Sequence, residues 1–284
     1  MLYVSDLDGT LLNYEGNLSA ASRAMLGSLL AQGLPFTVAS ARSVWSISQM
    51  LQGLDIKLPV IEFNGAFLSD IKTGRHIVVN SIAETVKHGI YLEIQASGFL
   101  PFISTYDGER DNLYHSEILN DGMAWYYNDR TKLKDPRLRP PRPLDCILDE
   151  QVICFTVIDR EQRLKPLEER LQRLYGDMVR LHLFRHLYCE GWHWLTIHDT
   201  RACKAKALTT LLDMLYLTKD DLTVFGDDIN DIEMFELAGR AIAVQNAILP
   251  VKERASIVIG SNREDSVAWF LHEEFKSQRS EVRI

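Results

Sequence analysis

Strand-like and helical segments alternate near both ends of this sequence, and this alternation limits the possible folds more than any other feature. Short β-rich runs are separated by segments with helical spacing, for example residues 19–33, where Ser19 and Gly33 stand where a helix cap and a helix stop belong. The β-rich runs are 2–6, 34–40, 59–63, 222–227, 241–245 and 255–259. Such alternation predicts an α/β fold in which crossover helices join parallel strands.

The middle of the sequence has a different character. Longer loops separate the expected strands at 99–106, 153–159 and 178–184, and a proline-rich segment, DPRLRPPRP, covers 135–143. We interpret that segment as a surface connection whose arginines are solvated. The 284-residue length also exceeds the usual size of one hydrophobic core. We therefore predict a core domain from residues 1–80 and 191–284, with a second α/β domain, residues 81–190, inserted into it.

Composition and charge exclude several classes of protein. The hydrophobic fraction of 46% and the charged fraction of 25% are those of an ordinary folded protein, and the net charge of −8 disfavours nucleic acid and anionic membranes as partners. The four cysteines form no CxxC pair, so a zinc site and a disulfide framework are both disfavoured. With no basic and apolar leader and no apolar stretch of about 20 residues, we expect a cytoplasmic protein.

Polar residues that suit metal and phosphate chemistry follow the expected core strands. Asp6 and Asp8 follow the first strand, Ser40 follows the second, Lys204 opens a helix, and GDDIND at 226–231 follows LTVF. Ligands of open parallel sheets bind at the carboxyl ends of the strands, so these groups should converge. Carboxylate oxygens suit Mg²⁺, which would relieve their mutual repulsion, while lysine, hydroxyl and backbone N–H groups suit a phosphate.

These motifs, in this order and at these separations, resemble the four motifs of the haloacid dehalogenase superfamily. More narrowly, the sequence resembles its Cof-type sugar-phosphate phosphatases, in which a large cap domain lies between the second and third motifs. The segments EFNGAFL at 62–68, QNA at 245–247 and SNREDSVAWFL at 261–271 match this group as well. The resemblance implies a Rossmann-like parallel-sheet core with an inserted α/β cap that sets substrate specificity.

The resemblance also implies roles for the acidic residues. Asp6 is expected to be the nucleophile that forms an aspartyl-phosphate, and Asp8 the general acid and base. The expected ligands of Mg²⁺ are a carboxylate oxygen of Asp6, the backbone carbonyl of Asp8 and the carboxylate of Asp227. Asp231 is expected to act through a water molecule or through another ligand.

The expected phosphate contacts come from the same resemblance. They are the backbone of Leu7, Ser40 together with the backbone of Ala41, Lys204 and Asn230. Taken alone, Ser40 would more often be a turn hydroxyl. The sequence departs from the common family pattern in Ser-Ala-Arg at 40–42, in Ala205 and in Ser266, and no departure removes a charge or the hydroxyl.

Other interpretations of nearby residues remain open. Lys206 competes with Lys204 for the phosphate, although KAKAL aligns better with the family pattern through Lys204. Glu62 and Asn64 could line the site, but Asn-Gly is also a strong turn signal, which we favour. The histidines of the segment 186–198 lack zinc-like spacing, and we attribute them to strand alternation.

The expected function is an Mg²⁺-dependent phosphatase for a small phosphorylated metabolite. Sugar phosphates are favoured, and nucleotides, pyridoxal phosphate and flavin mononucleotide are further candidates. A phosphotransferase such as a phosphomutase could use the same scaffold, since it differs only in retaining the phosphoryl group. A non-catalytic regulator that binds a phosphorylated metabolite is the alternative from another class, and the sequence indicates no oligomeric state.

Overall fold

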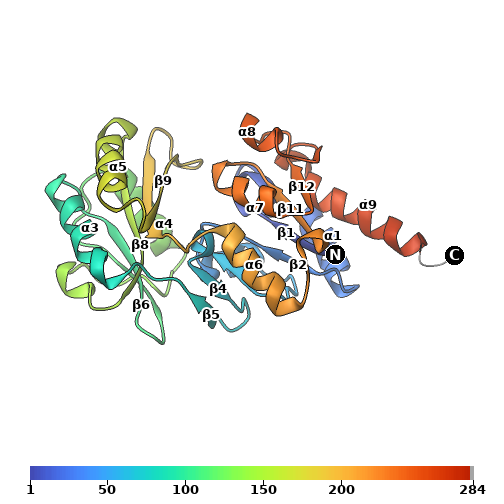
Figure 1. Ribbon diagram of the computed structural model, residues 1–284, viewed down its shortest axis with the longest axis horizontal. Coiled ribbons are helices and arrows are strands. Elements are labelled where there is room, and N and C mark those ends of the chain that lie inside the picture. Colours follow the sequence, from blue (N-terminus) through green and yellow to red (C-terminus); the bar gives the residue numbers. More distant parts are fainter. Residues whose placement is uncertain (282–284) are drawn as a thin grey trace. The chain divides into compact units, whose positions relative to one another are not determined.

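The β-rich runs 2–6, 34–40, 222–227, 241–245 and 255–259 form a parallel sheet, as predicted (Figure 1). The run 59–63 was expected to join it, whereas it pairs antiparallel in a separate sheet. The computed structural model describes residues 1–281 and divides them into two units, one of residues 1–79 and 203 onward, the other of residues 80–202. The sheet of unit 1 has the order β13-β12-β11-β1-β2, with every pair parallel. Its strands are β1 (Leu2–Ser5), β2 (Phe36–Val38), β11 (Leu222–Gly226), β12 (Arg240–Ala243) and β13 (Ile257–Val258).

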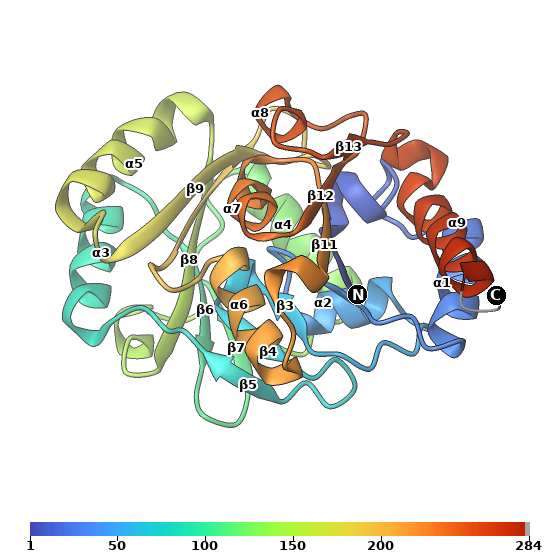
Figure 2. The same cartoon turned by 45° about the vertical axis from the view of Figure 1, so that its right-hand side comes forward.

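Helices cover both faces of this sheet. Figures 1 and 2 show α6 and α7 on one face, and α1 and α9 on the other. The Ser19 hydroxyl accepts a hydrogen bond from the Ser22 backbone N–H at 2.9 Å, which confirms the predicted helix cap. The helices of unit 1 are α1 (Ala20–Ala31), α2 (Val44–Met50), α6 (Lys204–Leu215), α7 (Ile232–Leu237), α8 (Leu249–Lys252) and α9 (Ser266–Glu281).

The order of the strands reverses between β1 and β11. The chain passes from β1 through α1 to β2 in one direction, and from β11 through α7 to β12 in the other. Asp6 directly follows β1, and Asp227 directly follows β11. Since the crossovers leave in opposite directions here, this is the switch point at which α/β sheets bind ligands.

A small antiparallel sheet extends unit 1. It has the order β3-β4-β5 and comprises β3 (Val60–Glu62), β4 (Phe67–Ser69) and β5 (His76–Val79). A parallel bridge between Ala39 and Ile61 connects the end of β2 to β3. The segment after β2 therefore lies beside the end of β3.

Unit 2 is built around an antiparallel sheet of order β7-β6-β8-β10-β9. Buried residues of α3 and α5 pack on one face of the sheet, and Met123 of α4 packs in a second cluster with sheet residues. The strands are β6 (Phe102–Tyr106), β7 (Asp111–Tyr114), β8 (Gln151–Asp159), β9 (Val179–Arg185) and β10 (His193–Asp199). The helices are α3 (Glu84–Ala96), α4 (Asp121–Lys132) and α5 (Glu161–Tyr175).

Short helical turns complete the secondary structure of the described residues. They are η1 (Leu7–Leu11), η2 (Phe63–Gly65), η3 (Asp145–Ile147), η4 (Lys219–Asp221), η5 (Ile229–Asp231) and η6 (Asn262–Glu264). Two of them lie just after core strands: η1 begins two residues after the end of β1, and η5 begins three residues after the end of β11. Within residues 1–281, none of the helices has the length and apolar character needed to cross a membrane.

Two details of the sequence interpretation differ from the structure. The core was expected to resume at residue 191, whereas residues 191–202 lie in unit 2, because β10 pairs with β8 and β9. The arginines of the proline-rich segment were expected to be solvated, whereas Arg137 is only 5% exposed. Its guanidinium pairs with the carboxylate of Asp135, with Nε–Oδ1 and Nη2–Oδ2 distances of 3.0 and 2.6 Å.

Candidate active site

The turns after β1 and β11 are locked together at the switch point. The Thr10 hydroxyl donates to Oδ1 of Asp227 at 2.5 Å. Gly9 has a φ of +81°, and a Cβ atom there would lie 2.3 Å from Oδ2 of Asp227. Only glycine fits this position, because any side chain would be strained in the left-handed region and would displace the Asp227 carboxylate.

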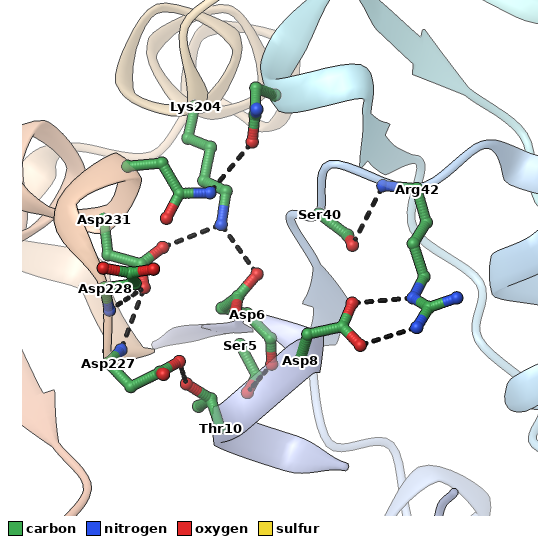
Figure 3. A network of polar contacts seen from close by, with 12 residues as sticks. Ser5, Asp6, Asp8, Thr10, Ser40, Arg42, Lys204, Asp227, Asp228 and Asp231 are labelled. Atoms are coloured by element: carbon green, nitrogen blue, oxygen red, sulfur yellow. Dashed lines mark hydrogen bonds and ion pairs between the residues drawn. The ribbon is translucent and has the colours of Figure 1, made fainter. Parts of the chain in front are cut away.

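Lys204 joins two of the acidic residues (Figure 3). Its Nζ lies 2.7 Å from Oδ1 of Asp6 and 2.7 Å from Oδ1 of Asp231, and all three side chains are buried. The second oxygen of Asp231 accepts hydrogen bonds from the backbone N–H groups of Asp227 and Asp228, at 2.9 and 3.1 Å. Asp231 is thus bonded at both oxygens and holds the turn after β11 against Lys204.

The acidic cluster is not neutralised by its own lysine. Burial raises the pKa of Asp6 to about 7, against the opposing effect of Lys204, and burial together with the Asp6 charge raises the pKa of Asp227 to about 9. Burial also opposes the charge of Lys204, but Asp231 and Asp6 outweigh it and raise the pKa of the lysine. Three carboxylates therefore lie together beside one ammonium group, which pairs with Asp6 and Asp231.

This donor set fits a divalent cation. Asp6, Asp227 and Asp231 each offer a carboxylate oxygen, and these three atoms lie within 4.8 Å of one another. Oxygen donors with excess negative charge are what Mg²⁺ prefers. A cation near them would also lower the cost of holding Asp6 and Asp227 ionised.

Asp8 points to a different partner. Nε and Nη2 of Arg42 donate to its two carboxylate oxygens, each at 2.6 Å, in a bidentate salt bridge (Figure 3). The backbone N–H of Arg42 in turn donates to the Ser40 hydroxyl at 3.2 Å. Asp8 is therefore held on the side of the β2 turn, whereas Asp6 is held by Lys204.

The structure places the remaining expected site residues around the same turns. Leu7 and Ser40 are buried and Ala41 is exposed at the end of β2. The side-chain amide of Asn230 donates to Oδ1 of Asn64 at 3.0 Å. Lys206, the alternative to Lys204, is exposed on α6, whereas Lys204 is buried and pairs with Asp6 and Asp231.

Glu62 and Asn64, whose roles the sequence left open, differ in what they contact. Glu62 is fully buried, and its carboxylate accepts from the backbone N–H of Val44 and from the Ser69 hydroxyl, so it supports the start of α2. Asn64 has a φ of +55°, as the turn interpretation requires, and it also contacts Asn230. The turn and the site are therefore compatible roles for Asn64.

Sequence reasoning missed two contacts within its own motifs. Thr10 is the last residue of DLDGT, and Arg42 is the last residue of Ser-Ala-Arg, but neither had been given a partner. A hydroxyl two residues after Asp8 and a guanidinium two residues after Ser40 were the available signals. Their partners, Asp227 and Asp8, lie in other segments and depend on how the strands pair.

Comparison with known proteins identifies the family. The model of the family described as haloacid dehalogenase-like hydrolase matches residues 3–271. The 5-amino-6-(5-phospho-D-ribitylamino)uracil phosphatase of Bacillus subtilis is 28% identical, covering 96% of this chain and 97% of the relative. The pyridoxal phosphate phosphatase of Escherichia coli is 27% identical, covering 94% and 96%.

A solved structure supports the fold independently. The crystal structure of a haloacid dehalogenase-like hydrolase from Bacteroides thetaiotaomicron has a TM-score of 0.78 at 24% identity, covering 96% of this chain and 98% of that chain. The predicted α/β fold class and the predicted enzyme class, a phosphoric monoester hydrolase, are confirmed by these matches. The chain belongs to the haloacid dehalogenase-like hydrolase family.

Proposed function

We propose that this protein is an Mg²⁺-dependent phosphatase that hydrolyses a small phosphorylated metabolite through an aspartyl-phosphate at Asp6. The observation that carries the proposal is the acidic cluster at the switch point, where Lys204 pairs with Asp6 and Asp231 and a carboxylate oxygen of Asp227 lies within 4.8 Å of theirs. A cluster with excess negative charge beside a lysine suits a cation and a phosphate together. Its place in a hydrolase family makes phosphate ester hydrolysis the matching chemistry.

In the first step, a carboxylate oxygen of Asp6 attacks phosphorus. A bond forms between that oxygen and phosphorus, and the bond from phosphorus to the ester oxygen breaks with its electron pair on the leaving oxygen. Asp8 gives the leaving oxygen a proton and becomes a carboxylate. Lys204 binds the other carboxylate oxygen of Asp6 and thereby orients the nucleophile.

In the second step, water cleaves the aspartyl-phosphate. The Asp8 carboxylate takes a proton from water while the water oxygen bonds to phosphorus. The bond between phosphorus and the Asp6 oxygen breaks, and its electron pair returns to Asp6. Inorganic phosphate leaves, and Asp8 has regained the proton that it needs for the next leaving group.

Metal and phosphate have separate sets of residues in this proposal. Mg²⁺ would be held by a carboxylate oxygen of Asp6, the backbone carbonyl of Asp8 and the carboxylate of Asp227. Asp231 would act through water or through its neighbours, which is supported by the hydrogen bonds at both of its oxygens. When bound, Mg²⁺ supplies positive charge that stabilises the transferring phosphoryl group.

The phosphoryl oxygens would be bound by groups that follow β1, β2 and β11 and by the first residue of α6. These are the backbone N–H groups of Leu7 and Ala41, the Ser40 hydroxyl, Lys204 and Asn230. Their work is positioning and charge stabilisation, because phosphoryl transfer needs little other chemistry from the protein. Asn64 supports this set, since its contact with Asn230 orients that amide.

Unit 2 is proposed to be the cap that selects the substrate, with its sheet and helices between residues 80 and 202. Sugar phosphates remain the favoured class. The relatives named for pyridoxal phosphate and for a phosphoribitylamino-uracil extend the candidates to other small phosphorylated metabolites. We place this activity in the cytoplasm.

The test is hydrolysis of 4-nitrophenyl phosphate with and without Mg²⁺, followed by a panel of metabolite phosphates ranked by kcat/KM. Wild-type activity that requires Mg²⁺ and is lost in Asp6→Asn is expected. Mass spectrometry of acid-quenched Asp8→Asn protein should show phosphate on Asp6. Transfer of phosphate to a second sugar instead of water would indicate a phosphomutase, and a wild-type protein inert on the whole panel would indicate a binding protein.

A further inference from the structure

Arg42 holds Asp8 more firmly than a single hydrogen bond would. Two nitrogens of one planar guanidinium bind two oxygens of one carboxylate, both at 2.6 Å. Such a paired contact fixes the plane of the carboxylate as well as its position. The side chains of Arg42 and Asp8 are only 18% and 26% exposed, so solvent competes weakly for them.

The backbone beneath Arg42 is itself fixed. Its N–H donates to the Ser40 hydroxyl, and its carbonyl accepts from the backbone N–H of Phe63 at 3.1 Å. The Ser40 carbonyl accepts from the N–H of Asn64 at 2.9 Å. The segment that carries Arg42 is thus tied to the segment after β3, and the guanidinium extends from an anchored base.

The chemistry of Asp8 makes orientation valuable. The two proposed steps require Asp8 to deliver a proton to the leaving oxygen and then to remove one from water. A carboxylate that rotates freely would spend much of its time in the wrong plane for both transfers. Asp6 has Lys204 for this purpose, and Arg42 stands in the corresponding relation to Asp8.

From this geometry we infer that Arg42 is a positioning residue, which orients the carboxyl group of Asp8 for proton transfer to the leaving group. This inference rests on the proposed function. Arg42 acts through Asp8, so its removal should matter most for substrates whose leaving oxygen needs a proton. A lysine at this position would keep the positive charge but could not make the bidentate contact with the Asp8 carboxylate.

The test compares two aryl phosphates of similar size. Phenol is a weaker acid than 4-nitrophenol, so phenolate is the poorer leaving group and depends more on a proton from Asp8. We expect Arg42→Gln to lower kcat for phenyl phosphate by about 100-fold, from a general-acid contribution of roughly 10²–10⁴. The loss for 4-nitrophenyl phosphate should be at least about tenfold smaller, and Arg42→Lys should lie between the wild type and Arg42→Gln.

Two controls separate positioning from folding and from direct contact. Arg254→Gln makes the same chemical change as Arg42→Gln in the exposed pair of Arg254 with Glu236 and should leave both activities unchanged. In an Asp8→Asn background, Arg42→Gln should cause little further loss, because residues that act as a unit are not additive. The midpoint of thermal unfolding shows whether Arg42→Gln is folded at the assay temperature.

The outcomes distinguish the inference from the proposed function. Equal losses on both substrates in folded Arg42→Gln, or a full further loss in the Asp8→Asn background, would overturn the inference and leave the phosphatase proposal intact. A wild-type protein that hydrolyses neither substrate with Mg²⁺ would overturn both. A selective loss on phenyl phosphate that disappears without Asp8 would support the inference.

Discussion

Each unit buries a set of acidic and basic side chains, and the two sets differ in their balance of charge. In unit 2, Asp135 and Arg137 form a one-to-one pair, and Arg137 outweighs burial and lowers the pKa of Asp135. In unit 1, Lys204 faces Asp6 and Asp231, with Asp227 beside them, and burial raises the pKa of Asp6 to about 7. The first arrangement is complete in itself, whereas the second needs a further positive charge.

This difference separates a structural ion pair from a functional site. Both Asp135 with Arg137 and Lys204 with its two partners are buried, so burial alone does not identify the site. Both contain a basic group within 2.7 Å of a carboxylate oxygen, so contact alone does not identify it either. The unbalanced charge does, because burial and neighbouring carboxylates raise the pKa values of Asp6 and Asp227, and acidic groups perturbed in this way are concentrated at functional sites.

Replacing the nucleophile should give the largest effect. Asp6→Asn is expected to lower kcat by roughly 10⁵-fold or more, as loss of a covalent nucleophile does in other enzymes. At pH 8 without metal, the same change should raise the free energy of unfolding by about 1 kcal/mol, since it removes one of the competing buried charges. Steady-state kinetics and urea unfolding measure the two effects, and lower stability at pH 8 would contradict the unbalanced-charge argument.

Breaking the balanced pair should destabilise the protein instead. Asp135→Asn leaves the Arg137 guanidinium buried without its carboxylate and is expected to lower the free energy of unfolding by about 3 kcal/mol. The double variant Asp135→Leu with Arg137→Met removes both charges and should recover most of that loss. Urea unfolding at pH 7 measures both variants. A loss below about 0.5 kcal/mol, the size typical of surface substitutions, would mean that the pair is not buried in solution.

Supplying the missing charge should stabilise unit 1. Mg²⁺ at about 100 times its dissociation constant should add about 2.7 kcal/mol to the free energy of unfolding, and chelation should remove it. Asp227→Asn should abolish most of this gain. Asp228→Asn is the matched control, because Asp228 is exposed on the same turn and an asparagine can keep its hydrogen bond to the backbone of Ile229.

Comparison with Asp228→Asn also shows which results would contradict a cation site at Asp227. Thermal unfolding with increasing Mg²⁺ should shift the midpoint for the wild type and for Asp228→Asn alike. An equal shift in Asp227→Asn would show that the stabilising ion binds elsewhere. The absence of any shift in the wild type would remove the cation from the proposed mechanism.

Much of unit 1 could be predicted from sequence because its signals are local. The cap at Ser19, the stop at Gly33, which has a φ of +91°, and the β-rich runs are each visible within a few residues. The end of the inserted unit could not be predicted in this way. The strand His193–Asp199 looks the same whether it pairs with the core or with β8 and β9, and its partners are far away in sequence.

The same limit applies to the site. Asp6, Lys204 and Asp227 could be chosen because they stand at recognisable positions in four motifs, and the structure brings Asp6 and Lys204 into contact. The contact between Arg42 and Asp8 depends on two turns that meet only after β1 and β2 have paired. The burial of Arg137 was also hidden, because a proline-rich composition indicates an exposed loop while the pairing with Asp135 depends on the local path of the chain.

A buried histidine offers a smaller test of unit 2, independent of the ion pairs. His198 in β10 is 2% exposed and faces the Cys154 thiol of β8, at 3.6 Å from Nε2 to Sγ, and the His182 ring of β9. Burial, aided by the positive charge of His182, lowers the pKa of His198 from 6.5 to about 3. Between these two pH values the unfolded chain binds a proton that the folded chain does not, so stability falls as the pH falls.

The size of this effect follows from the two pKa values. Lowering the pH from 7 to 5 should cost about 2 kcal/mol through His198 alone, since each pH unit below 6.5 is worth about 1.4 kcal/mol. His198→Gln should lose that part of the pH dependence, whereas the same change at the exposed His88 should not. Urea unfolding at both pH values gives the comparison. If His198→Gln and the wild type lost equal stability between pH 7 and 5, the buried ring would have to be protonated in the folded protein, and the balance of charge inside unit 2 would then need a carboxylate beside β10.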